Sequence, residues 1–77
     1  MQKKYVFFID EEKFDTDKPQ LSVKEILVEY GKFKSSENIL VLKEGSDLKE
    51  LEDLEKIINM KNGMHFTVFS KKPNTVS

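Results

Sequence analysis

Residues 5–31 are the part of this chain that most constrains its fold, because they predict a strand, a turn, a second strand and a capped helix in immediate succession. Residues 5–9 (YVFFI) are aromatic and β-branched, the composition that favours a pleated strand. Residues 10–13 are polar enough to reverse the chain, and residues 14–21 predict a weaker second strand with Pro19 near its end. A hairpin followed at once by a helix indicates that the helix covers the apolar face of the hairpin.

Both ends of the expected helix are marked in the sequence. Ser22 and Glu25 have the spacing of a capping box, in which each side chain accepts a hydrogen bond from the backbone N–H of the other residue. Gly31 then follows as a C-terminal stop. Between them, apolar side chains recur at helical spacing, at Val23, Ile26, Leu27 and Tyr30.

The second half of the chain contains two clear strands and one ambiguous segment. Residues 39–42 (ILVL) and residues 64–69 (MHFTVF) are apolar enough to be strands, and Asn62-Gly63 predicts a turn before the latter. Leucines at intervals of three predict a short helix or turn over residues 47–54, followed by a brief extended piece over residues 56–60. A helix continuing through residues 57–60 is the alternative, so helix and strand both stay open for residues 47–60.

Composition bounds the class of protein. A chain of 77 residues forms one domain, and the absence of cysteine excludes disulfides, thiolate catalysis and cysteine-based metal sites. The net charge is −1 and every basic residue is lysine, which disfavours nucleic acid as a partner. No apolar run approaches the length of a membrane span or resembles a signal peptide, so we expect a cytoplasmic protein without a membrane partner. We expect residues 1–70 to form the domain and residues 71–77 a flexible tail.

The order strand, strand, helix, strand, short element, strand allows the first and last strands to lie side by side in a sheet. We therefore expect an α+β protein with a ubiquitin-like β-grasp fold. Its mixed sheet would have four to five strands, with one main helix across one face. The residues expected in its core are Tyr5, Phe7, Ile9, Phe14, Val23, Ile26, Leu27, Leu40, Leu42, Met64, Phe66 and Val68.

Residues 5–31 (YVFFIDEEKFDTDKPQLSVKEILVEYG) resemble the opening of multiubiquitin-type domains, the ubiquitin-like proteins encoded in bacteria. Residues 39–42, 57–60 and 66–68 lie where that family has its later strands. The resemblance implies a non-enzymatic modifier, or a unit of one, that is bound by activating, conjugating or deconjugating enzymes. The last glycine is Gly63, whereas conjugated relatives end in glycine, so conjugation stays open. The alternative is a stand-alone docking or regulatory module that is never conjugated.

The candidate functional residues lie on the sheet face opposite the expected helix. Strand alternation predicts that one face carries Val6, Phe8, His65, Thr67 and Phe69. A partly apolar face of this size is typical of a protein-binding surface, unless residues 44–60 fold over it. No catalytic motif is present, and neither a cofactor nor a metal is expected, because the single histidine has no second ligand of its kind. A solvated helix face accounts for Glu50, Glu52, Asp53 and Glu55 better than a catalytic pair.

Overall fold

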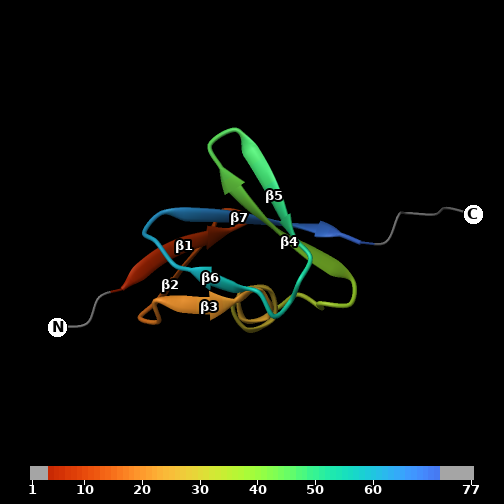
Figure 1. The fold of residues 1–77 in the computed structure, drawn as a ribbon, viewed down its shortest axis with the longest axis horizontal. Coiled ribbons are helices and arrows are strands. Elements are labelled where there is room, and N and C mark those ends of the chain that lie inside the picture. The colour runs from red at the N-terminus through yellow and green to blue at the C-terminus, as the bar shows by residue number, and fades with distance from the viewer. Residues whose placement is uncertain (1–3, 72–77) are drawn as a thin grey trace, which may run out of the picture.

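The structure is a computed structural model in which residues 4–71 are described. Figure 1 shows a strand-rich chain in which one short helical segment lies beneath the sheet. The elements, in chain order, are β1 (Tyr5–Ile9), β2 (Glu12–Thr16), β3 (Gln20–Ser22), η1 (Glu25–Tyr30), β4 (Asn38–Glu44), β5 (Asp47–Leu51), β6 (Ile57–Asn59) and β7 (Met64–Ser70). The expected tail lies almost entirely outside the described residues.

Five strands form the main sheet, in the order β2-β1-β7-β4-β5. β1 and β7 are parallel, with Phe8 opposite His65, and every other neighbouring pair is antiparallel. The expected adjacency of the first and last strands within a mixed sheet is therefore confirmed. β4 pairs with β7 over residues 38–43 and 65–70, which joins the second half of the chain to the first.

The expected ubiquitin-like β-grasp fold with one main helix is wrong for this structure. Strands hold 51% of the described residues, helical turns hold 12%, and no helix reaches seven residues. The helical segment η1 has six residues and is wound as a π-helix. The N–H groups of Gly31 and Phe33 donate to the carbonyls of Ile26 and Leu27. These hydrogen bonds widen the last turn of the segment and close it.

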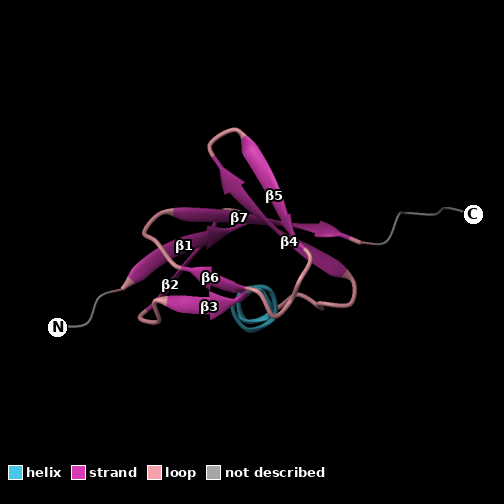
Figure 2. Ribbon diagram, viewed as in Figure 1, coloured by secondary structure: helices cyan, strands magenta, loops and turns pink. Residues whose placement is uncertain are grey.

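A second, two-stranded sheet replaces much of the cover that a longer helix would have supplied. β3 and β6 pair antiparallel and, with η1, lie beneath the inner face of the five-stranded sheet (Figure 2). We call this pair the β3–β6 ribbon. The core between the layers contains Phe7, Ile9, Leu21, Val23, Ile26, Leu27, Leu40, Leu42, Leu51, Ile58, Met60 and Phe66.

The expected core residues are all in this cluster or packed against it. Tyr5, Phe14, Met64 and Val68 are the partly buried ones. The sequence prediction missed Leu21, Leu51, Ile58 and Met60, because it did not foresee the ribbon or the fifth strand.

The short helix expected over residues 47–54 is wrong, whereas an extended piece within residues 56–60 is confirmed as β6. Residues 47–51 form β5, which pairs with β4 through the two-residue loop Gly45-Ser46. Gly45 has a φ of +61°, and Gly as the first residue of such a loop is typical of a type II′ hairpin turn. The hairpin projects from the body of the molecule, and Leu48 is 57% exposed on it.

Gly31 is required because a side chain would not fit at this position. Its φ of −78° is one that any residue can adopt. A Cβ at this position would lie 2.9 Å from the Leu27 carbonyl oxygen and 3.0 Å from Cδ2 of Phe33. The positive φ that ends the segment belongs to Lys32, at +65°. The predicted stop at Gly31 is thus in place, although its cause is close packing and not a left-handed backbone.

No helix within residues 4–71 is long and apolar enough to span a membrane.

Candidate functional site

All five predicted site residues lie on one side of the main sheet, which we call the outer face. Phe7, Ile9 and Phe66 point into the core. Alternation along β1 and β7 therefore turns Val6, Phe8, His65, Thr67 and Phe69 the other way. Residues 57–60 lie on the core side, where Ile58 and Met60 are buried, so the ribbon does not cover the outer face.

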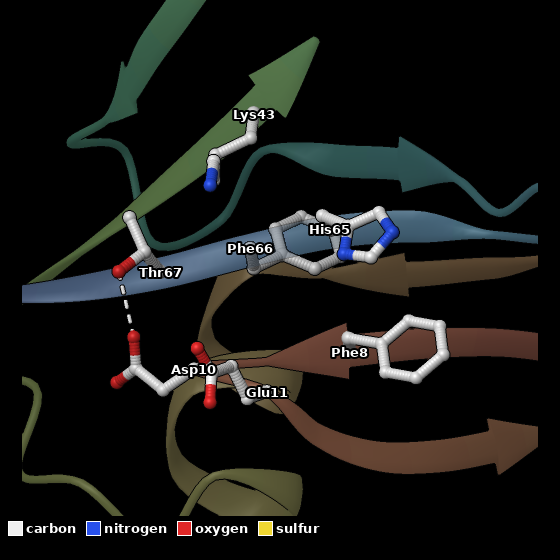
Figure 3. Close-up of a pocket in the computed structure, with 7 residues that line it drawn as sticks. All are labelled: Phe8, Asp10, Glu11, Lys43, His65, Phe66 and Thr67. Carbon is white, nitrogen blue, oxygen red and sulfur yellow. Dashed lines mark hydrogen bonds between the residues drawn. The ribbon is translucent and has the colours of Figure 1, made fainter. Parts of the chain in front are cut away.

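An aromatic stack occupies the middle of the outer face. The rings of Phe8 and His65 lie 4.7 Å apart between centroids, with an interplanar angle of 8°. The parallel register places the two residues directly side by side on β1 and β7 (Figure 3). The stack gives the face a flat apolar surface that ends in the polar nitrogens of an imidazole.

A lysine flanks the stack on each side. Lys13 on β2 is opposite Phe8, and Lys43 on β4 is opposite His65. The next residue in the same row is Leu48 on β5, opposite Lys43. The sequence prediction missed both lysines, because it assigned no strand register to residues 10–13 and 43.

Beside the stack is an open hollow of about 450 Å³. Figure 3 shows Lys43 on one side of it and the carboxylates of Asp10 and Glu11 on the other. The Thr67 hydroxyl donates a 2.6 Å hydrogen bond to Asp10 Oδ1, which also accepts a 3.3 Å bond from the Val68 N–H. Asp10 is therefore fixed against β7, and the Thr67 hydroxyl is oriented toward that carboxylate.

The hollow is bordered by an unusual turn. Asp10 and Glu11 have φ values of 49° and 73°, so both central residues of the β1–β2 hairpin are left-handed, as in a type I′ turn. Such turns favour Asn-Gly or Asp-Gly, and a glutamate in the second position is strained. The sequence prediction placed a chain reversal here but did not identify these acidic residues as part of the site.

The structure brings together only part of the predicted set. Phe8, His65 and Thr67 line the hollow, whereas Val6 and Phe69 lie toward opposite ends of the face and do not. Val6 is fixed through its backbone: its N–H donates to Asn62 Oδ1 and its carbonyl accepts from the Gly63 N–H. Phe69 is 49% exposed and is opposite Ile39.

This arrangement is suited to binding. The stack and Phe69 offer apolar area, while Lys13, Lys43, Asp10 and Glu11 offer charges of both signs at its border. The Glu25 carboxyl, whose pKa is lowered by a hydrogen bond from the Ser22 backbone, lies at the start of η1 and away from this face. Within residues 4–71, no cluster of three or more histidine or acidic side chains is placed to hold a metal ion.

Comparison of the chain with protein-family models, with curated proteins and with solved structures found no match. The resemblance of residues 5–31 to multiubiquitin-type domains therefore stays a prediction.

Proposed function

We propose that this chain is a non-enzymatic protein-binding module that docks a partner protein on its outer face. The observation that carries the proposal is the Phe8–His65 stack, set between Lys13 and Lys43 in one row of the sheet. Aromatic area with a charged border is the composition of many protein interfaces. Phe8 is half-buried and His65 is exposed, so part of this aromatic area meets water. Exposed aromatic area carries a risk of aggregation, which a binding role would justify.

The residues of the outer face are expected to contribute to partner binding in different ways. Phe69, half exposed in the free protein, would gain about 1 kcal/mol from complete burial against a partner. The stack supplies a flat contact of the kind that often dominates binding energy. The lysines act mainly on the rate of association, so their contribution should weaken with salt.

The resemblance of residues 5–31 supports one class of partner, the activating, conjugating or deconjugating enzymes of a bacterial ubiquitin-like pathway. The intact mass of the protein recovered from its native host separates the two forms of the proposal. A covalent adduct through the C-terminus supports the modifier, and its absence together with stable non-covalent complexes supports the stand-alone docking module.

The docking surface is tested by affinity capture from the native host with three baits: the unchanged chain, the Phe8→Ser/Phe69→Ser double variant, and Glu29→Ser. Glu29 is exposed on η1, on the inner side of the sheet, so Glu29→Ser is a surface change outside the outer face. Each captured protein is then purified and titrated by calorimetry. The proposal expects at least one captured protein that binds the unchanged chain and Glu29→Ser but does not bind a double variant that keeps its circular dichroism spectrum.

If every captured protein binds the folded double variant as tightly as the unchanged chain, the outer face is not the docking surface. Complete absence of any captured partner would contradict the function itself.

A further inference from the structure

A second hollow, of about 460 Å³, lies between the ribbon and the far ends of β4 and β7. We call it the edge groove, and its lining includes Leu42, Lys43, Lys56, Ile57, Lys61 and Met64. It shares only Lys43 with the hollow on the outer face. The proposal built on it is independent of the function proposed above, because it rests on the open edge of β6 and on Lys56 and Lys61 and does not need Lys43.

One wall of the edge groove is a strand with an open edge. Among residues 4–71, β6 pairs with β3 alone. The Val23 N–H donates to the Lys56 carbonyl, and the Met60 N–H donates to the Pro19 carbonyl. Because backbone groups alternate in direction along an antiparallel ladder, Lys56, Ile58 and Met60 face β3. The N–H and C=O groups of Ile57 and Asn59 therefore point away from β3, toward the open edge.

The opposite wall of the edge groove includes residues 61–64, which hydrogen bonds hold in place in the free protein. The turn before β7 is fixed to β1, with the Gly63 N–H donating to the Val6 carbonyl at 2.7 Å and Asn62 Oδ1 accepting from the Val6 N–H at 2.8 Å. The Lys61 N–H also lies 3.3 Å from the Met64 sulfur. A preformed wall lowers the ordering cost of binding.

The charge of the groove indicates its occupant. Lys43, Lys56 and Lys61 line it, and none of them has a carboxylate partner within 4 Å among the described residues. The only acidic side chain in the lining is Glu44, which is paired with Lys49 at 3.9 Å. The chain as a whole has a net charge of −1, so this local excess of positive charge is a property of the groove.

We infer that the edge groove binds an extended, acidic peptide segment of a partner protein, which adds as a strand to the open edge of β6. The backbone groups of Ile57 and Asn59 would pair with the added strand. Lys56 and Lys61 would face acidic side chains along it, and the exposed Ile57 side chain would pack against an apolar residue of the segment.

The test uses synthetic peptides blocked at both ends and two-dimensional amide NMR of the whole chain. The probe is Glu-Glu-Val-Ile-Val-Glu-Glu. Its controls are the same peptide with lysine in place of glutamate, and the same peptide with alternate backbone nitrogens methylated. The inference expects the acidic probe to shift the Ile57 and Asn59 amide signals and to slow their hydrogen exchange, while neither control does so.

Charge reversal separates the edge groove from the rest of the surface. Lys56→Glu/Lys61→Glu should weaken probe binding by roughly tenfold, because each change removes an exposed ion pair and adds a repulsion of similar size. The charge-matched control Lys13→Glu/Lys71→Glu, outside the groove, should bind as the unchanged chain does. Lys56→Gln/Lys61→Gln gives the same comparison with a milder change if the reversed variant fails to fold.

Three outcomes overturn the inference. The first is the absence of shifts at Ile57 and Asn59 at millimolar acidic probe. The second is equal binding of the methylated or the basic peptide. The third is loss of probe binding in the folded Phe8→Ser/Phe69→Ser variant, which would place the site on the outer face instead.

Discussion

At the scale of single residues, the sharpest local conflict lies in the β1–β2 turn. Glu11 has a φ of +73°, a backbone conformation that costs an ordinary L-residue about 1–2 kcal/mol. Its carboxylate lines the hollow on the outer face, beside the fixed Asp10. Strain of this kind often accumulates at functional sites, so the position of Glu11 agrees with the binding role proposed for the outer face.

Glu11→Gly should therefore stabilise the fold by roughly 1 kcal/mol, because Asp-Gly is a favoured pair in a type I′ turn. Urea unfolding followed by circular dichroism measures the change. Lys13→Gly, in the neighbouring strand, is the control and should destabilise the protein. Loss of stability in the Glu11 variant would show that its side chain contributes more than its backbone costs.

The capping box predicts a dependence of stability on pH. The Ser22 N–H donates to Glu25 Oε1 at 2.8 Å, and the Glu25 N–H donates to Ser22 Oγ at 3.1 Å. The hydrogen bond from the Ser22 backbone, and then the charge of Lys18, hold the pKa of Glu25 below its ordinary value of 4.5. A depressed carboxyl pKa stabilises the fold above the unfolded value, and that stabilisation is lost as the pH falls through the folded pKa.

Glu25→Gln keeps a capping side chain but removes the charge, so it should be less stable than the unchanged chain near neutral pH. The difference should shrink as the pH falls below the ordinary value of 4.5. Urea midpoints across this range measure it. Ser22→Ala, which removes one hydrogen bond of the box, should cost about 1 kcal/mol at neutral pH. A difference between Glu25→Gln and the unchanged chain that does not vary with pH would contradict the assigned cause of the shift.

At the scale of elements, η1 is short but central. Ile26 and Leu27 are fully buried, and Val23 just before the segment is fully buried too. Ile26→Ala should cost roughly 2–5 kcal/mol, because it leaves a cavity between η1 and the sheet. In a domain of this size that is enough to unfold much of the population. Thermal and urea unfolding measure the loss, and Glu29→Ala, exposed on the same segment, should change stability little.

Local signals in the sequence predicted the elements whose cause is local. The capping box, the apolar spacing from Val23 to Tyr30 and the Asn62-Gly63 turn depend on neighbouring residues, and all three are in the structure. The π-type winding of η1 was beyond such signals, because it depends on the hydrogen bonds from Gly31 and Phe33 back to Ile26 and Leu27. β5 was mistaken for a helix because leucine spacing was given more weight than Gly45-Ser46, a pair typical of hairpin turns.

At the scale of the whole molecule, the sheet has two faces that differ in kind. Strand alternation was sufficient to predict that Phe8, His65 and Thr67 share the outer face. It did not predict their neighbours, because Lys13, Lys43 and Asp10 join the site through pairing between distant strands. The edge groove could not be predicted from the sequence for the same reason, since it exists only where the ribbon meets β4 and β7.

The difference between the faces leads to the last prediction. Phe7 is completely buried, whereas Phe69 is 49% exposed. Phe7→Ala should therefore cost about 3–5 kcal/mol, comparable to the whole stability of so small a domain. Phe69→Ala should cost about 1 kcal/mol or less.

Urea unfolding of both variants measures this difference, and amide NMR shows whether each one stays folded. A slip of one residue in the pairing of a strand would turn its inner side chains outward. If Phe69→Ala proved the more damaging change, β7 would present its opposite side to the core. His65 and Thr67 would then leave the outer face, and the docking surface proposed here would lose its centre. The stability of two phenylalanine variants thus tests the geometry on which the proposed function depends, before any partner is known.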